Sequence, residues 1–310
     1  MITATATESA AVKTLYTQWQ ETRFYGDDQI YYTASFERNG DRFRVAFAQQ
    51  REMGMTAAAV LAMKLIQLFR PRYLVMPGIA AGISTQKTDE QFYGDVVVAD
   101  VVWNYAAGKF VSTDCADIQF GGIGFIPRPT VIRMDPKIRT CVEKAVNSSE
   151  NQCHVRIGPM ACGSTVVANR EILDKQIHSQ FPHTIGLDME SYAVIYAAEN
   201  AVQPRPYALV IKGVSDYADG EKSDDYQKFA AYTSAEFAKL LYEKYLPLNR
   251  TDPVGLGEWS WKNGCQTPPE MRSSMICVRS AVCLCRNFNF SEQRVCCVHN
   301  SEVSPWSGTH

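Results

Sequence analysis

The sequence predicts an α/β fold, and more closely a three-layer α/β/α sandwich with a central mixed β-sheet. Short runs of apolar and β-branched residues alternate with amphipathic segments as far as about Leu248, which is the pattern of strands and helices in α/β domains. The runs are apolar almost throughout, as is typical of strands that are covered on both faces. The expected strands are Phe43–Ala48, Arg72–Gly78, Asp95–Trp103 and Pro206–Gly213.

Three amphipathic segments supply the helices that such a sheet needs. The first, Met55–Pro71, places apolar side chains three or four residues apart and ends at a proline, which cannot continue a helix. Its apolar face consists of Ala58, Leu61, Leu65 and Leu68. Met189–Ala201 and Tyr226–Leu246 follow the same logic, and the last of them ends before Pro247. The sandwich is therefore expected to span residues 1–248 as one large domain.

The composition excludes several classes of partner. With 310 residues, of which 46% are hydrophobic and 21% charged, the chain is typical of soluble globular proteins. Its 31 Lys and Arg residues against 33 Asp and Glu give a formal net charge of −2, which offers no basic surface to nucleic acid or to a membrane. No stretch approaches the roughly 20 apolar residues that span a bilayer, and the N-terminus lacks the features of a signal peptide. We therefore expect a cytoplasmic protein that binds neither nucleic acid nor membrane.

Residues 249–310 differ in composition from the rest of the chain. Six of the ten cysteines follow Arg250, and the other four are scattered through the first region, as in a reduced intracellular domain. The tail also contains His299, but it lacks the paired Cys-x-x-Cys and His-x-x-x-His arrangement of a zinc site, so no metal is predicted. Because the tail has no hydrophobic periodicity and contains Ser, Pro and Gly, we expect a poorly ordered, Cys-rich C-terminal extension.

Open α/β sheets bind their ligands at the carboxyl ends of strands, and three such ends stand out. They are Val75–Ser84, Gly158–Asn169 and the segment at Ser215 and Asp216. In the first, Gly78 and Gly82 would let the backbone approach a sugar or phosphate closely, although a tight strand-to-helix turn explains them equally well. No Gly-Lys-Ser/Thr follows, so this is not a P-loop. Gly121–Phe125 is expected to be a loop, since no strand leads into it.

Acidic residues occupy two of these positions. Asp188 and Glu190 precede a small, apolar helix, and a carboxylate in apolar surroundings usually needs a partner. Capping of the helix by Asp188, with Glu190 in the first turn, is the alternative. Asp216 follows the last expected strand beside Ser215, where its carboxyl group could act as a general acid. An Asx turn is the alternative there.

Together and in this order, the loops resemble the purine nucleoside phosphorylase/nucleosidase superfamily, in particular the 5′-methylthioadenosine/S-adenosylhomocysteine nucleosidases. "PGIAAGI" with the downstream "YGDVVVAD" resembles the family's Gly-rich loop and following strand, "LDMES" its ribose motif and "GVSDYAD" its base motif. The likeness runs from about Ile2 to Leu246. In finer detail, "GPMACGSTVVAN" and "VVWNYAAGK" are similar to the phosphorylase-like effectors of antiviral and innate-immune systems, members of which cleave adenine nucleotides such as ATP.

The resemblance implies a role for each residue of the ribose and base motifs. Glu190 would hold the ribose hydroxyls, and Met189 would pack against the sugar. Asp216 would protonate N7 of the purine as the glycosidic bond breaks, with Ser215 orienting it. Gly78 would belong to the loop that approaches the ribose or phosphate.

Further positions complete the implied site and favour hydrolysis over phosphorolysis. Phosphorylases of this superfamily hold phosphate with an arginine just before the Gly-rich loop, where this chain has Met76, and with a serine within it, where it has Ala80. Water is therefore the expected nucleophile, and Glu8 is the residue expected to position it. Val166 and Val167 fall where the family lines the base with backbone groups.

Positive charges suggest the identity of the 5′ group. Lys222 lies in the segment that corresponds to the family's lid over the 5′ substituent, Lys212 lies on the strand before it, and Arg51 is expected near the sugar's 5′ side. A cationic rim of this kind suits a 5′-phosphate or triphosphate. Ordinary solvated charges are the alternative.

The sequence thus predicts a purine nucleotide N-glycosidase. It would hydrolyse ATP or related adenine nucleotides to adenine and a ribose phosphate, without a cofactor, as the innate-immune effectors do. One alternative is a methylthioadenosine/S-adenosylhomocysteine nucleosidase, and another is a silent nucleotide-binding module. The joint presence of Glu190, Ser215 and Asp216 weighs against a catalytically silent module. Family members commonly form dimers or larger rings, so the resemblance also implies a homo-oligomer.

Overall fold

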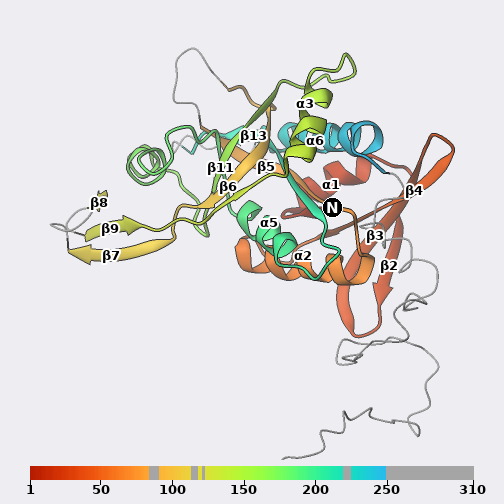
Figure 1. Ribbon diagram of the computed structural model, residues 1–310, viewed down its shortest axis with the longest axis horizontal. Helices are drawn as coiled ribbons and strands as arrows, with labels where there is room; N and C mark the ends of the chain where they lie inside the picture. Colours follow the sequence, from red (N-terminus) through yellow and green to blue (C-terminus); the bar gives the residue numbers. More distant parts are fainter. Residues whose placement is uncertain (84–90, 113–117, 121–122, 219–224, 249–310) are drawn as a thin grey trace, which may run out of the picture. The chain divides into compact units, whose positions relative to one another are not determined.

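The structure, a computed structural model, describes residues 1–83, 91–112, 118–120, 123–218 and 225–248 (Figure 1). Lys222 and the extension expected at residues 249–310 lie outside the described residues. Among the helices that are described, none has both the length and the apolar character needed to cross a membrane.

A six-stranded mixed sheet forms the centre of the fold. Its strands lie in the order β10-β6-β11-β12-β5-β13, and β6 also pairs with β13. Their bounds are β5 Tyr73–Gly82, β6 Val96–Asn104, β10 Val131–Arg133, β11 Val155–Cys162, β12 Gly186–Asp188 and β13 Tyr207–Asp216. The pairs β6–β11, β11–β12 and β5–β13 are parallel, whereas β12–β5 and β13–β6 are antiparallel. Five of the strands therefore form a closed ring of pairings, and β10 is attached to it at β6.

Helices cover both faces of this sheet, as the apolar strands require. On one face lie α2 (Met55–Phe69) and α5 (Ser191–Glu199), and on the other lie α1 (Ala6–Thr14), α3 (Pro136–Val146) and α6 (Gln227–Leu240) (Figure 1). Each layer has its own cluster of buried apolar side chains against the strands. The three-layer α/β/α sandwich is therefore confirmed.

The expected helices agree with the structure within a few residues. Helix α2 ends at Phe69, and Arg70 takes a left-handed conformation (φ 45°) just before Pro71. Helix α6 continues into a π-helical turn at Leu241–Tyr245, close to the expected end at Leu246. A second π-helical turn, Leu173–His178, follows the short α4 (Arg170–Ile172).

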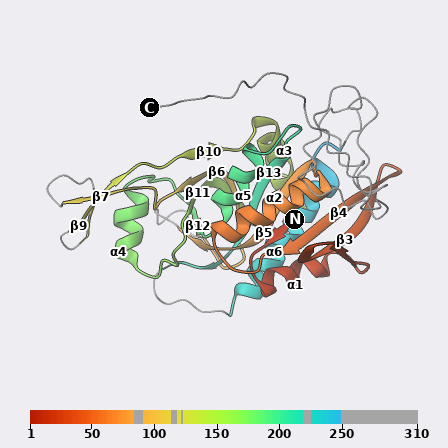
Figure 2. The same ribbon diagram turned by 90° about the horizontal axis from the view of Figure 1, so that it is seen from below.

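Two of the expected loops are largely strand. The segment "PGIAAG", Pro77–Gly82, completes β5 and pairs with β13, so the Gly-rich stretch is not a turn. Gly121–Phe125 was expected to be a loop, but Ile123–Phe125 belongs to β9 (Ile123–Pro127). This strand pairs with β7 (Gly108–Ser112) and β8 (Ile118–Phe120) in a small antiparallel sheet away from the main one (Figure 2). The ladders with β7 and with the adjacent β8 make it a strand.

A four-stranded sheet contributes the N-terminal side of the fold. Its order is β1-β4-β3-β2, with bounds β1 Ile2–Thr3, β2 Gln20–Phe24, β3 Asp27–Arg38 and β4 Asp41–Gln49. The expected strand Phe43–Ala48 lies within β4. Because β1 runs parallel to the end of β4, the start of α1 and the loop between β4 and α2 come to the same region of the molecule.

Candidate active site

A cavity of about 130 Å³ lies at the carboxyl ends of β5, β11, β12 and β13. It is lined by residues from six parts of the chain: Ala4, Thr5, Glu8, Met53, Ile79, Ala80, Ala81, Thr165, Val166, Val167, Leu187, Asp188, Met189, Glu190, Ser215 and Asp216. Most residues singled out in the sequence are therefore brought together here. The position agrees with the rule that α/β sheets bind ligands beyond their strand ends.

Asp216 is placed in the cavity by an irregularity at the end of β13. Val214 pairs with Ala80 and Asp216 with Ala81, so that Ser215 is an extra residue in the strand. Such a bulge changes the direction in which the following side chain points. The Asp216 carboxylate accepts hydrogen bonds from Ser215 Oγ (3.0 Å) and from the Ala218 backbone N–H (3.1 Å). The second contact is an Asx turn, so the turn proposed as an alternative forms and the carboxylate still lines the cavity.

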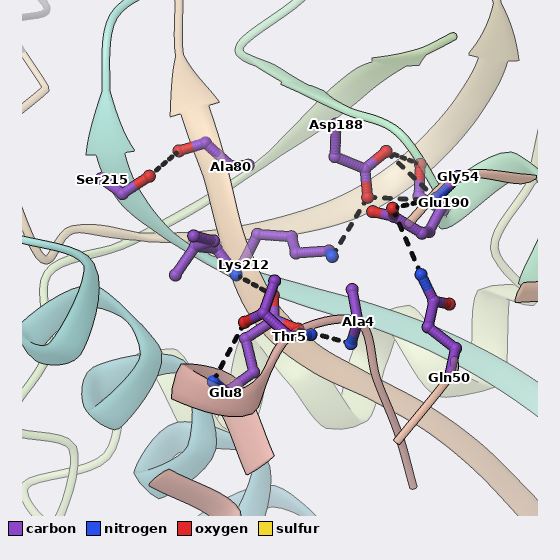
Figure 3. A network of polar contacts seen from close by, with 12 residues as sticks. Ala4, Thr5, Glu8, Gln50, Gly54, Ala80, Asp188, Glu190, Lys212 and Ser215 are labelled. Atoms are coloured by element: carbon purple, nitrogen blue, oxygen red, sulfur yellow. Dashed lines mark hydrogen bonds and ion pairs between the residues drawn. The ribbon is translucent and has the colours of Figure 1, made fainter. Parts of the chain in front are cut away.

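Glu190 and Asp188 lie at the start of α5 and face different partners. Asp188 caps the helix, accepting hydrogen bonds from the Ser191 hydroxyl (2.6 Å) and backbone N–H (3.1 Å). Glu190 accepts a hydrogen bond at 2.7 Å from the Gly54 N–H and a longer one from Gln50 Nε2 at 3.4 Å (Figure 3). The capping alternative therefore accounts for Asp188 and leaves Glu190 for another purpose. Gln50 and Gly54, which position it, were not predicted.

Burial is the main influence on the ionisation of Glu190. Removal from water raises the pKa of this carboxyl group, the positive charge of Lys212 opposes the shift, and the negative charge of Asp188 adds to it. The net result is a pKa above the usual range. Glu190 therefore takes up a proton more readily than an exposed glutamate does.

Lys212 lies at the centre of this charged cluster and not at a rim. Its side chain is 0% exposed, and its amine lies 3.2 Å from Asp188 Oδ2 (Figure 3). Although burial disfavours the charged amine, the negative charges of Asp188, Glu8 and Glu190 raise the pKa of Lys212 above its usual range. The prediction that this lysine lies with a cationic rim was wrong, because its side chain extends between buried carboxylates.

Gly78 makes the space in which Glu8 and Lys212 approach each other. A Cβ atom at Gly78 would lie 2.3 Å from Glu8 Oε1 and 3.1 Å from Lys212 Nζ. The first distance is shorter than any real contact, so a side chain here would displace the carboxylate. Gly78 itself does not line the cavity in the way that its neighbours Ile79 and Ala80 do.

Glu8 joins helix α1 to strand β5. Its Oε2 accepts hydrogen bonds from the backbone N–H groups of Ala4 (2.5 Å) and Thr5 (3.0 Å), and its Oε1 accepts one from Ile79 N–H (2.8 Å). The Thr5 hydroxyl accepts from the Glu8 N–H in return, which makes a capping box. The spacing Thr-x-x-Glu was a signal for this structural role. Glu8 nevertheless lines the cavity beside Glu190.

The opposite wall of the cavity is mostly apolar. Val166 is half exposed (51%) and Val167 is buried, and both lie in the loop after β11. The buried Tyr105 supports this loop, because its hydroxyl donates a hydrogen bond to the Thr165 carbonyl at 3.0 Å. No sequence signal pointed to Tyr105, which lies 60 residues before its partner.

Arg51 lies in a second, larger hollow of about 570 Å³ that adjoins the first at Met53. The ionisable residues of its lining are Asp27, Asp28, Arg51, Glu52 and Lys64. Lys64 pairs with Asp27 at 2.6 Å, and Arg51, 63% exposed, lies 4.0 Å from Asp28. Charges of both signs therefore line this hollow, which differs from the cationic rim that was expected.

Within the described residues, no group of three or more His, Cys, Asp or Glu side chains is arranged to hold a metal ion. The acids of the cavity are instead matched with backbone N–H groups and with Lys212. Proton transfer by carboxyl groups is a reaction step that this arrangement can support.

Comparison with known proteins places this site in a family. The family model described as "Phosphorylase superfamily" matches residues 2–246. The chain belongs to the phosphorylase superfamily. The match covers the whole described part of the chain except its ends, and it includes every residue that lines the acidic cavity.

Several curated proteins are similar in sequence. An uncharacterized protein, y4jS, of Sinorhizobium fredii is 32% identical over 235 residues, which cover 71% of this chain and 54% of the relative. The death domain-containing ATP nucleosidase of Amphimedon queenslandica is 25% identical over 200 residues (60% and 36%). The ATP nucleosidase Cap17 of Escherichia coli is 23% identical over 262 residues (76% and 49%). The chain thus spans about half of these relatives' length or less.

Solved structures of the superfamily share the fold. The 5′-methylthioadenosine/S-adenosylhomocysteine nucleosidase of Neisseria meningitidis, in complex with methylthio-immucillin-A, aligns with a TM-score of 0.61 at 22% identity, covering 78% of this chain and 96% of that one. The S-adenosylhomocysteine nucleosidase of Streptococcus pyogenes aligns with a TM-score of 0.63 at 22% identity, covering 80% and 96%. The fold expected from the three loops is thereby confirmed.

Proposed function

We propose that this chain is a purine N-glycosidase that hydrolyses ATP or a related adenine nucleotide to adenine and a ribose phosphate. One observation carries the proposal: Glu8, Glu190 and Asp216, which come from the start, the middle and the end of the domain, line a single cavity. Each is almost fully buried, and structural needs alone rarely gather three carboxyl groups around one space.

The arrangement matches the needs of glycosidic bond cleavage. A purine leaves readily only when it is protonated, and the sugar left behind carries developing positive charge. Asp216 is the proposed general acid for the base. Glu190 and Glu8 are the proposed sugar-side groups, with Glu190 holding the ribose hydroxyls and Glu8 positioning the attacking water. Glu8 Oε2 already accepts two N–H groups, but Oε1 accepts only that of Ile79 and keeps a second lone pair for a water molecule.

The lining of the cavity favours water over phosphate as the nucleophile. It contains neither arginine nor lysine, and Lys212, which lies behind it, is paired with Asp188. Met76 is buried in the core, and Ala80 offers no hydroxyl. Among the described residues that line the cavity, a phosphate ion would find no cation and would meet the carboxyl groups of Glu8, Asp188, Glu190 and Asp216. Hydrolysis is therefore the proposed reaction.

Adenine nucleotides are the proposed substrates because two of the similar curated proteins are described as ATP nucleosidases. Arg51 in the adjoining hollow, and Lys222 outside the described residues, are the proposed contacts of the 5′-phosphates. A role as an innate-immune effector in the cytoplasm, and assembly into a homo-oligomer, are further proposals that rest on the resemblance.

A second substrate is favoured by the charges of the adjoining hollow. Asp27, Asp28 and Glu52 outnumber Arg51 and Lys64 in its lining, which disfavours a polyanion. Met53, a large apolar side chain that is 62% exposed, lies at the junction of the two cavities. An apolar 5′-alkylthio group would find a better environment there, so methylthioadenosine is the second candidate.

The deciding experiment incubates the purified chain with ATP, AMP, adenosine and methylthioadenosine, with and without phosphate, and separates the products by chromatography. We expect adenine from ATP without phosphate. Adenine from methylthioadenosine alone would assign the second substrate instead. A requirement for phosphate would establish phosphorolysis, and ligand binding without any adenine would establish a silent module, seen as a gain in thermal stability.

A further inference from the structure

A cluster of three tyrosines lies directly beyond Asp216. Tyr217 follows the acid in sequence, and its ring centroid lies 5.0 Å from that of Tyr93 at an interplanar angle of 48°. The ring of Tyr226, the residue before α6, stacks on Tyr93 at 3.9 Å and 2°. None of the three rings lines the acidic cavity, so the proposed chemistry gives them no role.

Hydrogen bonds attach the same segment to both sides of the acid. The Tyr217 hydroxyl donates to the Gln91 carbonyl at 2.7 Å. Gln91 is 6% exposed, and its side-chain Nε2 donates to the Ile185 carbonyl at 2.8 Å. Before the acid, Gly94 N–H donates to the Val214 carbonyl, and Val214 N–H donates to the Asp95 carbonyl (2.9 and 2.8 Å). Residues 91–95 therefore hold Val214 on one side of Asp216 and Tyr217 on the other.

This attachment matters because the bonds of the carboxylate are local. Asp216 is held by Ser215 Oγ and by Ala218 N–H, both within its own turn. On the β5 side this end of β13 is held by the pairing of Asp216 with Ala81 and by a long hydrogen bond from Ser215 Oγ to the Ala80 carbonyl (3.4 Å), which leaves the side of Tyr217 to other contacts. Ala218 also has a φ of 56°, a conformation that is unfavourable for a residue other than glycine and persists only where the surroundings impose it.

We propose that Tyr217, anchored by the Gln91 carbonyl and the Tyr93 ring, is a positioning residue that fixes the Asp216 carboxyl group against the departing base. Tyr93 is the common support, because it contacts Tyr217 on one side and Tyr226 on the other. This inference rests on the proposed function, since it assumes that Asp216 protonates a base. It adds that the acid is placed from outside its own turn.

The alternative is that the tyrosines only contribute packing. Loss of packing would lower the stability of the whole domain and affect every substrate alike. Loss of positioning would affect only the step in which Asp216 gives up its proton. A misplacement of about 1 Å can cost roughly 100-fold in rate, whereas binding of the sugar, which depends on Glu190, would stay the same.

The test compares Tyr217→Ala, Tyr217→Phe, Tyr93→Ala and Tyr93→Phe with the parent, and with Tyr232→Ala as a control. Tyr232 is an exposed tyrosine of α6 outside the cluster. Base release is measured on the nucleoside or nucleotide that the parent cleaves, with kcat and KM separated and kcat followed against pH. A nitrophenyl riboside, whose phenolate leaves without a proton, is assayed in parallel, and melting temperatures are recorded.

We expect both alanine variants to lose about 10- to 100-fold in kcat for base release, a part of what general acid catalysis contributes, with KM nearly unchanged. The shape of kcat against pH should change in these variants, because the proton donor is no longer aligned with the base, and cleavage of any nitrophenyl riboside that the parent accepts should be retained. Tyr93→Phe keeps the ring and should keep the activity. Tyr217→Phe loses one hydrogen bond and should fall in between.

Three results would overturn the inference. If the parent is active and its alanine variants have the same kcat as the parent, the positioning role is wrong and the proposed function still stands. The cluster would be assigned to packing if the variants lose melting temperature and cleave the nucleoside and the nitrophenyl riboside more slowly to the same extent, with an unchanged shape of the pH profile. A parent that releases no base from any nucleoside or nucleotide would overturn the proposed function, and this inference with it.

Discussion

The two ends of the cavity are built on different principles. At the proposed sugar end, Glu8, Asp188, Glu190 and Lys212 come from α1, from the junction of β12 and α5, and from β13, and all are nearly or fully buried. At the proposed base end, Asp216 is the one carboxyl group among the described lining residues, and it is held by its own turn. The first end is a network of charges fixed by long-range contacts, and the second is a single acid on a bulge.

This difference corresponds to the proposed chemical role of each end. Three carboxyl groups against one amine leave an excess of negative charge beside the proposed sugar, where positive charge would develop. The network is already assembled, so the charges need not rearrange during the reaction. A proton donor, in contrast, depends more on its position relative to the base than on the electrostatic field around it. Substitutions at the two ends should therefore impair the protein in different ways.

The largest effect is expected from Asp216→Asn. The amide oxygen can still accept from Ala218 N–H and the amide NH2 can donate to the Ser215 hydroxyl, so the turn and the melting temperature should be retained, but the amide is not an acid that can protonate the base. Base release should fall by about 10²- to 10⁴-fold, as measured by chromatography of adenine. Asp135→Asn, at the exposed N-cap of α3, is the matched control. Activity equal to that of the parent would show that another group is the acid.

Lys212→Met should damage the sugar end through stability as well as turnover. Removal of one partner of a buried ion pair costs about 3–5 kcal/mol in the free energy of unfolding, and Asp188 would be left without its cation. Urea unfolding of the variant measures the loss. Lys228→Met, at an exposed position of α6, should change it little. Equal stability of the two variants would mean that the Lys212 charge is not needed.

Glu190→Gln should separate activity from stability. The amide oxygen can still accept from Gly54 N–H, but the ribose contact and the charge are lost, so turnover should fall roughly 10- to 100-fold. Because folding raises the pKa of Glu190, the folded chain holds this proton more tightly than the unfolded chain does. The stability contribution is thus complete below the usual glutamate pKa of 4.5 and is lost as pH rises through the higher folded value.

The corresponding measurement is the melting temperature of parent and Glu190→Gln between pH 4 and pH 8. The variant should be the more stable protein at pH 8, and the difference should shrink as pH falls toward 4. A difference that stays constant with pH would contradict the raised pKa. A parent that is more stable than the variant at pH 8 would show that the charge of Glu190 is needed by the fold.

The smallest effect is expected from Arg51→Gln. This substitution tests whether charges in the hollow beside the cavity also contribute to substrate binding. For ATP, KM should rise by roughly two- to fivefold, in line with the small energies of exposed ion pairs, and for methylthioadenosine it should not change. Arg133→Gln, an exposed residue of β10, is the control. An equal KM of parent and variant for ATP would leave Arg51 as the partner of Asp28 alone.

The sequence was a better guide to the base end than to the sugar end. Ser215 and Asp216 stand next to each other at a strand end, so a local motif contains nearly all the information. Glu190 could be singled out as well, but its partner Gly54 lies 136 residues away. The burial of Lys212 depends on the absence of a side chain at Gly78 on the neighbouring strand, and nothing in the local sequence reports which residues become neighbours.

The same limit explains the errors in the fold. "PGIAAG" reads as a turn because it consists of small residues, but the small residues are needed where Glu8 and Val214 press against β5. Strand β9 was missed because the glycines of "GGIGF" interrupt the apolar pattern, although the strand pairs with the adjacent β8 as well as with β7. The strands and helices with continuous apolar patterns were predicted within a few residues, since burial on one or both faces leaves a direct trace in the sequence.

The closed ring of strand pairings links the order of synthesis to the assembly of the site. Strand β13 closes the ring by pairing with both β5 and β6, and it also ends in Asp216. A growing chain can therefore form the N-terminal sheet long before the residue proposed to protonate the base exists. Pairings of such large sequence separation form slowly, so the appearance of activity during refolding should report completion of the ring and not the earlier collapse of the core.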